Sequence, residues 1–156
     1  MTDGAHASRK VLASNRKAFR DYFVEDRLEA GLELLGTEVK SLRAGDVNLT
    51  GAFIRVVNGE VHVFGMNIKP YAFGNQFNHE ADRHRRLLLH RREIGKLKIQ
   101  QEQKGFTLIP LSVYFRRGLA KLELGVCRGK QQSDKRETLK KKTADREMER
   151  ALRHRR

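Results

Sequence analysis

Residues 28–49 change their hydrophobic period once, and this change predicts a strand followed by a short helix. Apolar residues first recur at every second position, at Leu28, Ala30, Leu32 and Leu34. This alternation is typical of a strand with one buried face. In the helix that follows, we expect Thr37 to accept an amide hydrogen at the start, Glu38 to suit the positive end and Gly45 to end it.

The junction between this strand and this helix is the first candidate binding surface. Lys40 and Arg43 are three residues apart and therefore share a helix face. We expect them to lie beside the carboxylate of Glu29, where they would form a phosphate-reading surface. The pattern alone also fits a solvated Glu29 and ordinary surface charge.

Other β-rich segments flank this stretch. Phe19, Tyr22 and Val24 predict a first strand before an acidic turn at Glu25-Asp26, paired antiparallel with the strand at 28–35. Runs 52–57 and 61–64 are separated by Asn-Gly, which is the strongest short-range signal of a hairpin.

The second half of the chain contains a loop, a helix and two more strands. Residues 66–86 are polar and basic and predict a long loop, and residues 91–104 have the composition of a helix. A strand at 106–115 contains Pro110, which lacks an amide donor and therefore indicates an edge or a bulge. Residues 120–127 alternate again and predict the last strand.

Six or seven short strands with two or three short helices and tight turns predict a mainly β protein. The arrangement that suits them is a closed or partly closed antiparallel β-barrel. We expect a flexible arm over residues 1–14, the barrel over residues 15–128 and a basic tail over residues 129–156. The tail has eleven lysine and arginine residues against five acidic ones, and its few apolar residues cannot bury enough surface to fold alone.

Charge favours a polyanionic partner. The 156 residues include 33 Lys and Arg against 19 Asp and Glu, a formal net charge of +14, which indicates nucleic acid. No apolar run approaches the roughly 20 residues needed to span a bilayer, so we expect no membrane association. Cys127 is the single cysteine and is expected to be a buried, inert thiol, which fits a cytoplasmic protein.

Motifs for catalysis are absent from the sequence. His79 and His84 are five residues apart, whereas zinc proteases need two histidines four apart on one helix face. The chain has no Gly-x-Ser-x-Gly elbow and no Walker loop. We therefore expect no metal site, no cofactor and no enzyme activity, with a hydrolase whose site escapes these patterns as one alternative.

Several short motifs together resemble one protein family. Residues 36–43, Gly-Thr-Glu-Val-Lys-Ser-Leu-Arg, are followed in order by 47–49, 58–60, 78–80, 85–90, 122–125 and 134–137. Over about residues 15–140 this order resembles SmpB, the small protein B family that partners bacterial transfer-messenger RNA. The resemblance implies an OB-like barrel that binds the tRNA-like domain of this RNA and delivers it to stalled ribosomes for trans-translation, acting as a monomer.

The resemblance also implies which residues bind RNA. These are Asn15, Arg16, Glu29 and Leu88, and the matched motif at 47–49 adds Asn48. From their basic charge we add Lys40, Arg43, Arg85, Arg86, Lys121 and Lys130, which also fit ordinary surface charge. In the tail, the residues implied to bind the small-subunit decoding centre are Asp134, Lys135, Arg136, Lys140, Lys141 and Lys142.

Two positions depart from the family pattern. Ser133 stands where an aromatic residue or histidine able to stack on ribosomal RNA is usual, and Arg16 stands where lysine is common. The tail is rich in helix formers but has a thin apolar stripe, so we expect it to be disordered when free and helical on the ribosome. A general OB-type RNA-binding or ribosome-associated protein remains the other reading.

Overall fold

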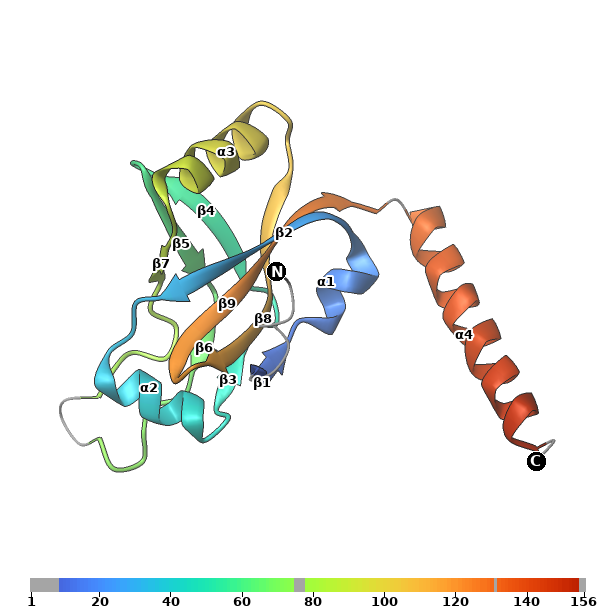
Figure 1. The fold of residues 1–156 in the computed structure, drawn as a ribbon, viewed down its shortest axis with the longest axis horizontal. Coiled ribbons are helices and arrows are strands. Elements are labelled where there is room, and N and C mark those ends of the chain that lie inside the picture. Colours follow the sequence, from blue (N-terminus) through green and yellow to red (C-terminus); the bar gives the residue numbers. More distant parts are fainter. Residues whose placement is uncertain (1–8, 75–77, 131, 155–156) are drawn as a thin grey trace.

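The computed structural model describes residues 9–74, 78–130 and 132–154, with only the backbone described at 132–135, 137, 138 and 154. These residues form nine strands and four helices (Figure 1). The strands are β1 (Arg9–Ser14), β2 (Tyr22–Leu32), β3 (Val47–Asn48), β4 (Phe53–Val57), β5 (Glu60–Phe64), β6 (Asn67–Ile68), β7 (Arg85–Leu88), β8 (Thr107–Arg116) and β9 (Leu119–Gly129). The helices are α1 (Arg16–Asp21), α2 (Gly36–Arg43), α3 (Arg91–Glu102) and α4 (Gln132–His154).

Six strands close into a barrel. They pair antiparallel in the order β8-β4-β5-β7-β2-β9, and β9 pairs back with β8 to complete the ring. Strand β1 pairs with β8 along the edge opposite to β9. Strands β3 and β6 pair in a separate two-stranded sheet. The predicted mainly β, OB-like antiparallel barrel is therefore confirmed.

The barrel interior is the main hydrophobic core. Alternate residues of β4 and β5 point inward, among them Ile54 and Val63, which are at most 2% exposed. Two helices add one fully buried leucine each, Leu42 from α2 and Leu97 from α3. The predicted helix at 91–104 is confirmed, with Leu97 as its core anchor.

The predicted turns and the predicted bulge are present. Asn58 and Gly59 have φ values of 52° and 75°, which a two-residue turn between paired strands requires. Pro110 lies inside β8, and the register of β8 against β9 shifts between Pro110 and Ser112. The missing amide donor of proline is accommodated by this bulge.

The predicted pair of strands in the first half of the barrel is wrong. Residues 22–32 form one strand, β2, and Phe19 belongs to α1. The acidic pair does not turn the chain, because the register of β2 against β9 shifts between Val24 and Asp26. A β-bulge absorbs the extra residue while the strand continues.

The prediction of a flexible arm over residues 1–14 is wrong for residues 9–14. They form β1, which pairs with β8 from Arg9 opposite Arg116 to Ser14 opposite Ser112. This segment has a weak strand pattern of its own. The exposed edge of β8 supplies the backbone partners, so tertiary pairing decides its structure.

The predicted cap of α2 is also wrong. Leu35, and not Thr37, occupies the N-cap position, and the backbone amide of Leu35 donates to the Glu38 carboxylate at 2.8 Å. The Thr37 hydroxyl is instead 2.9 Å from Nδ1 of His79. Glu38 does lie in the first turn, where a carboxylate is favoured.

A second, smaller apolar cluster fixes α1 on the outside of the barrel. Ala18 of α1 packs with Ile109 and Leu111 of β8 and with Cys127 of β9. Burial raises the pKa of the Cys127 thiol to about 11, so this thiol is protonated at neutral pH. The prediction of a buried cysteine is confirmed.

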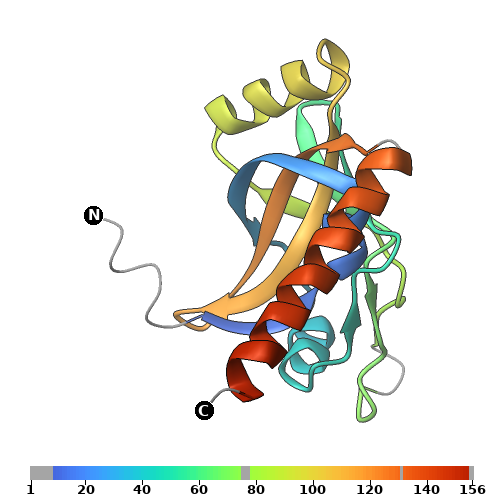
Figure 2. The same ribbon diagram turned by 90° about the vertical axis from the view of Figure 1, so that its right-hand side faces the viewer.

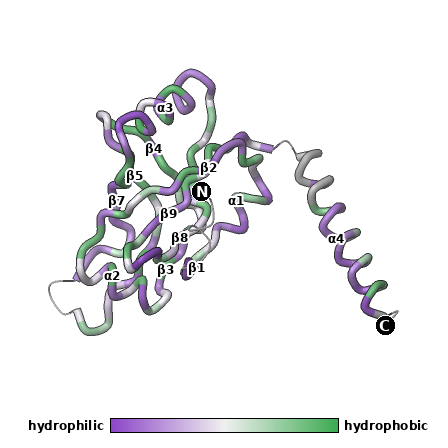
Figure 3. The backbone as a smooth tube through the Cα atoms, in the orientation of Figure 1, coloured by the Kyte–Doolittle hydropathy of each residue, from purple (hydrophilic) through white to green (hydrophobic). Residues whose placement is uncertain are grey.

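Helix α4 projects from the barrel after β9 (Figures 1 and 2). Figure 3 shows mostly hydrophilic residues along it, and its larger apolar side chains are exposed, with Leu139 at 50% and Met148 at 67%. The helix thus has no hydrophobic partner along most of its length. Its disorder in the free protein stays a prediction.

Candidate nucleic-acid interface

The barrel surface has a hollow of about 390 Å³ where β7, β2 and β9 run side by side. In β2, Gly31 pairs with Leu88 of β7 on one side and with Lys121 of β9 on the other. These three residues therefore form one row across three strands. Glu29, two residues before Gly31, lines the same hollow, which we call the Glu29 hollow.

Glycine in the middle of this row keeps the hollow open. A Cβ atom at Gly31 would lie 3.2 Å from Cβ of Leu88, which is tighter than ordinary packing. Leu88 is 48% exposed although it is a large apolar residue. The hollow thus offers two carboxylates, those of Glu29 and Glu93, together with an ammonium group and an apolar side chain within one depression.

The Glu29 carboxylate is held by residues of β8. The Tyr114 hydroxyl donates to it at 2.5 Å, and the Arg116 guanidinium donates to both of its oxygens at 3.2 Å. Burial alone would raise the pKa of Glu29, but these hydrogen bonds and the charge of Arg116 bring it below its usual value. Burial and the hydrogen bond to Glu29 raise the pKa of Tyr114. At neutral pH the site therefore has a charged carboxylate of fixed orientation and a neutral phenol.

Arg9 of β1 packs on Tyr114 beside Glu29. Its guanidinium lies 4.2 Å from the centre of the Tyr114 ring and donates to the Tyr114 hydroxyl at 3.1 Å. It also pairs with Glu123 of β9 at 3.2 Å. No local sequence pattern marks Arg9, Tyr114 and Arg116, because only the pairing of β1 with β8, of β8 with β9 and of β9 with β2 brings them to Glu29.

The structure does not place Lys40 and Arg43 at Glu29. Both are exposed on α2, and the Lys40 ammonium group lies 5.4 Å from the centre of the Tyr71 ring. The expected junction of Glu29 with these two cations is wrong, because the chain leaves β2 at Leu32 before α2 begins at Gly36. They form a separate basic surface.

Asn15 has a structural role in this conformation. Its side-chain amide donates to the carbonyl of Pro110 at 3.0 Å, and its oxygen accepts from the Ala18 amide at 3.2 Å. Asn15 is only 6% exposed and caps α1. It therefore fixes the start of the helix, where Arg16 is exposed as the first residue, and the RNA contact predicted for Asn15 stays a prediction.

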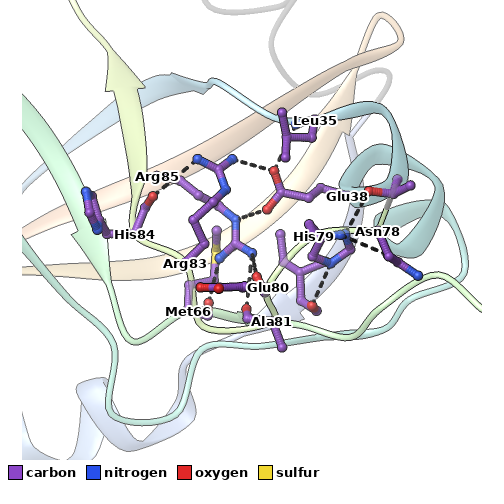
Figure 4. A network of polar contacts seen from close by, with 12 residues as sticks. Leu35, Glu38, Met66, Asn78, His79, Glu80, Ala81, Arg83, His84 and Arg85 are labelled. Carbon is purple, nitrogen blue, oxygen red and sulfur yellow. Dashed lines mark hydrogen bonds and ion pairs between the residues drawn. The ribbon is translucent and has the colours of Figure 1, made fainter. Parts of the chain in front are cut away.

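Arg85 cannot act as the predicted surface contact with RNA. Its side chain is fully buried and pairs with the equally buried Glu38 (Figure 4). Its guanidinium also donates to the carbonyls of Met66 at 2.7 Å and Ala81 at 3.1 Å. The sequence does not reveal which of Arg83, Arg85 and Arg86 has a buried guanidinium.

The carboxylate of Glu38 joins two arginines and a backbone amide. Arg85 donates to one oxygen of this carboxylate, and Arg83 donates to the other at 2.5 Å (Figure 4). Burial alone would raise the pKa of Glu38, but the hydrogen bonds from Arg83, Leu35 and Arg85 lower it. This network connects α2 to residues 66–86 and so orients the basic face of α2.

The remaining barrel residues of the predicted set lie on the surface. Asn48 is exposed, and its side-chain oxygen accepts from the Thr50 amide at 2.8 Å. Arg86 is 50% exposed beside Glu33 at 3.8 Å. Lys130 donates to the Phe19 carbonyl at 3.2 Å, near the start of the tail.

Four of the predicted tail residues, Arg136, Lys140, Lys141 and Lys142, are exposed on α4. The side chains of Asp134 and Lys135, and that of Ser133, lie outside the described residues. Exposure along one helix makes these cations accessible to a polyanion.

His79 uses both ring nitrogens inside the protein. Nδ1 lies 2.9 Å from the Thr37 hydroxyl and Nε2 lies 2.8 Å from the Ile68 carbonyl oxygen. Within the described ranges no group of three or more His, Cys, Asp or Glu side chains is placed to hold a metal ion. No helix in the part of the chain that the structure describes is long and apolar enough to cross a membrane.

A closed β-barrel in a chain of net charge +14, with exposed cations on α2 and on a projecting helix, has the features of a nucleic-acid-binding module. A family model described as SmpB protein matches residues 12–154. The chain belongs to the SmpB family.

Relatives with similar sequences match nearly the whole length of this chain. The SsrA-binding protein of Bacillus cytotoxicus is 55% identical over 148 residues, which are 95% of this chain and 96% of that protein. The SsrA-binding protein of Syntrophotalea carbinolica is 53% identical over 146 residues, which are 94% and 97% of the two chains. A chain from a solved structure described as "tmRNA-SmpB: a journey to the center of the bacterial ribosome" is 46% identical, with a TM-score of 0.65, and the match covers 81% of this chain and 93% of that one.

Proposed function

We propose that this protein binds the tRNA-like domain of transfer-messenger RNA and delivers that RNA to stalled ribosomes for trans-translation. The observation that carries the proposal is the Glu29 hollow, where a fixed carboxylate, an exposed leucine and a lysine meet on one barrel face. Membership of the SmpB family and the SsrA-binding relatives support it.

Each group of the hollow suits a different part of RNA. Lys121 attracts a phosphate, and Leu88 offers an apolar surface on which an unstacked base packs. The Glu29 carboxylate accepts hydrogen bonds from a base amino group or from a ribose hydroxyl, which distinguishes RNA from DNA. Arg16, Lys40 and Arg43 supply further exposed cations.

The second partner is the ribosome, at the decoding centre of the small subunit. The exposed cations of α4 match a surface of ribosomal RNA, and we place the helix there when the barrel has bound transfer-messenger RNA. The likeness to the structure described as tmRNA-SmpB at the centre of the bacterial ribosome supports this partner.

The protein acts by binding and not by catalysis, and it acts as a monomer in the cytoplasm, where its two partners work. Tyr114 and Arg116 hold the Glu29 carboxylate in place, as fixed groups of a recognition surface are held. Their function is to fix a shape that an RNA recognises.

A filter-binding competition tests the proposal. Labelled tRNA-like domain of transfer-messenger RNA is bound to the full chain, and unlabelled transfer-messenger RNA, bulk tRNA or single-stranded RNA is added at one fixed salt concentration, since affinity depends strongly on salt. We expect transfer-messenger RNA to compete at far lower concentration than the other two. Equal competition by all three would instead indicate a general RNA-binding protein.

A further inference from the structure

The outer face of β4, β5 and β7 has four aromatic rings in series. Phe53 stacks on Phe64 with ring centroids 5.4 Å apart and planes 16° apart, and Phe64 stacks on His84 at 5.4 Å and 26°. His62 meets His84 edge to face at 5.5 Å. We call Phe53, Phe64, His62 and His84 the aromatic strip.

The barrel core does not require this strip. Alternation along β4 and β5 directs Ile54 and Val63 inward and therefore directs Phe53 and Phe64 outward. Phe53 is 37% exposed, and His84 is exposed as well. Stacking of Phe53 on Phe64 stabilises the hairpin of β4 and β5. This role does not require the further stacking on His84, which lies outside the hairpin.

The strip has a cationic neighbour at Phe53 and an open end, and at its other end His62 pairs with Glu60 at 3.0 Å. The Arg55 guanidinium lies 5.1 Å from the centre of the Phe53 ring. Beyond Phe53 is a second hollow of about 380 Å³, whose lining includes Arg55, Gln101, Phe106 and Thr107. An aromatic wall with arginine and polar side chains beside it is the composition of a base-stacking platform.

The strip is continuous with the Glu29 hollow. In β7, Arg86 and Leu88 point outward, and Arg86 pairs in register with His62 of the strip. Leu88 lines the Glu29 hollow. A strand of RNA that leaves this hollow across β7 therefore meets the aromatic strip next.

We propose that the aromatic strip is a second contact for the tRNA-like domain, in which an unpaired base stacks on Phe53 beside Arg55. This inference rests on the proposed function and adds a surface to it. Continuity with the Glu29 hollow favours transfer-messenger RNA over ribosomal RNA as the source of the base.

The absence of tryptophan from the chain allows a direct test. A Phe53→Trp variant has a single tryptophan at the end of the strip, and its emission reports a base that stacks there. Leu152→Trp is the control, because Leu152 is 65% exposed near the far end of α4 (Figure 1). The isolated tRNA-like domain should quench the emission of the first variant and leave that of the control unchanged.

Affinity provides a second readout. Phe53→Ala should weaken binding by about five- to a hundredfold, the range expected for loss of one stacked base, and Phe53→Tyr should bind normally. Because stacking neutralises no phosphate, the slope of log K against log salt should stay the same in Phe53→Ala, whereas Arg55→Gln should reduce it. Circular dichroism checks that each variant is folded.

The outcomes separate this inference from the proposed function. Normal binding of the RNA with unchanged emission of Phe53→Trp and normal affinity of Phe53→Ala would overturn the strip and leave the proposed function intact. Quenching by small ribosomal subunits but not by the tRNA-like domain would overturn it in favour of ribosomal RNA. Failure of the unsubstituted chain to bind the tRNA-like domain would overturn both.

Discussion

Glu29 shows how a negative side chain can serve an RNA-binding surface. Tyr114 and Arg116 fix its carboxylate at the edge of a hollow that also contains Lys121. A carboxylate near phosphates costs electrostatic energy, so its presence is favourable only where its oxygens accept specific hydrogen bonds. If Glu29 accepts a hydrogen bond from RNA, removing its charge should weaken RNA binding. If Glu29 makes no such contact, removing its charge should strengthen RNA binding or leave it unchanged.

We predict different effects for two substitutions that remove the same charge. Glu29→Gln should weaken binding to the tRNA-like domain by about tenfold or more, because the charged acceptor becomes a neutral amide and one acceptor oxygen is replaced by an NH2 donor. Glu33→Gln, at a side chain that is 59% exposed, should bind equally well or slightly better, because one repulsive charge is removed. Equal strengthening in both variants, measured by fluorescence anisotropy, would show that Glu29 makes no specific contact.

The buried pair of Glu38 and Arg85 makes a second prediction at the scale of residues. Glu38→Gln leaves the fully buried Arg85 without its anionic partner and should destabilise the protein by about 3 kcal/mol or more. Urea unfolding at neutral pH measures this difference. A change below about 1 kcal/mol would contradict the role of the pair.

The pH dependence of the same variant follows from the direction of the shift. The pKa of Glu38 is lowered in the folded protein, so its carboxylate contributes stability that is present above the usual value of 4.5 and lost as the pH falls through the folded value. Glu38→Gln has no such group. The difference in unfolding free energy between the two proteins should therefore narrow as the pH falls below 4.5.

At the scale of elements, local signals predicted some parts of the fold and missed others. The turn at Asn58-Gly59 and the bulge at Pro110 were predictable because backbone chemistry at those positions allows few alternatives. Strand β1 was not, because its structure depends on the edge of β8. The acidic pair in β2 suggested a turn, since a bulge and a turn use similar residues.

In the candidate site, too, some residues were predictable from the sequence and others were not. Motif resemblance placed Glu29 and Leu88 in one set and basic charge added Lys121, and the structure brings these three into one hollow. The resemblance could not indicate that Arg85 and Asn15 are buried, because burial depends on the partners that distant segments supply. Tyr114 and Arg116 were missed for the same reason.

The tail carries the prediction that belongs to the scale of elements. Removal of residues 130–156 should leave the affinity of the barrel for the tRNA-like domain nearly unchanged and abolish peptide tagging on stalled ribosomes. Among the side chains that the structure describes, the barrel core contains none from α4, so the shortened chain should still fold. Full tagging without the tail would contradict this assignment.

The free tail provides a related measurement. Its exposed face and unbalanced charge give a helix little support outside a complex, and an isolated helix of this length is marginal in water. Circular dichroism of a peptide of residues 130–156 should show low helicity in buffer. A stable helix in the free peptide would contradict disorder before binding.

At the scale of the whole molecule, a net charge of +14 brings the protein to RNA and a shaped face selects which RNA it holds. The barrel carries the Glu29 hollow and the basic face of α2, and α4 projects from the barrel (Figure 1). One chain thus presents two separate surfaces, which a protein that connects transfer-messenger RNA to the ribosome requires.

The central claim is that the tRNA-like domain occupies the Glu29 hollow, and photo-crosslinking tests it most directly. Leu88 is replaced by p-benzoylphenylalanine in the full chain, and Ile99, which is equally exposed at 47% but lies on α3, is replaced in a control. We expect irradiation of the complex to join the RNA to position 88 and not to position 99. Crosslinking at position 99 without crosslinking at position 88, in a complex that binds with normal affinity, would contradict the account.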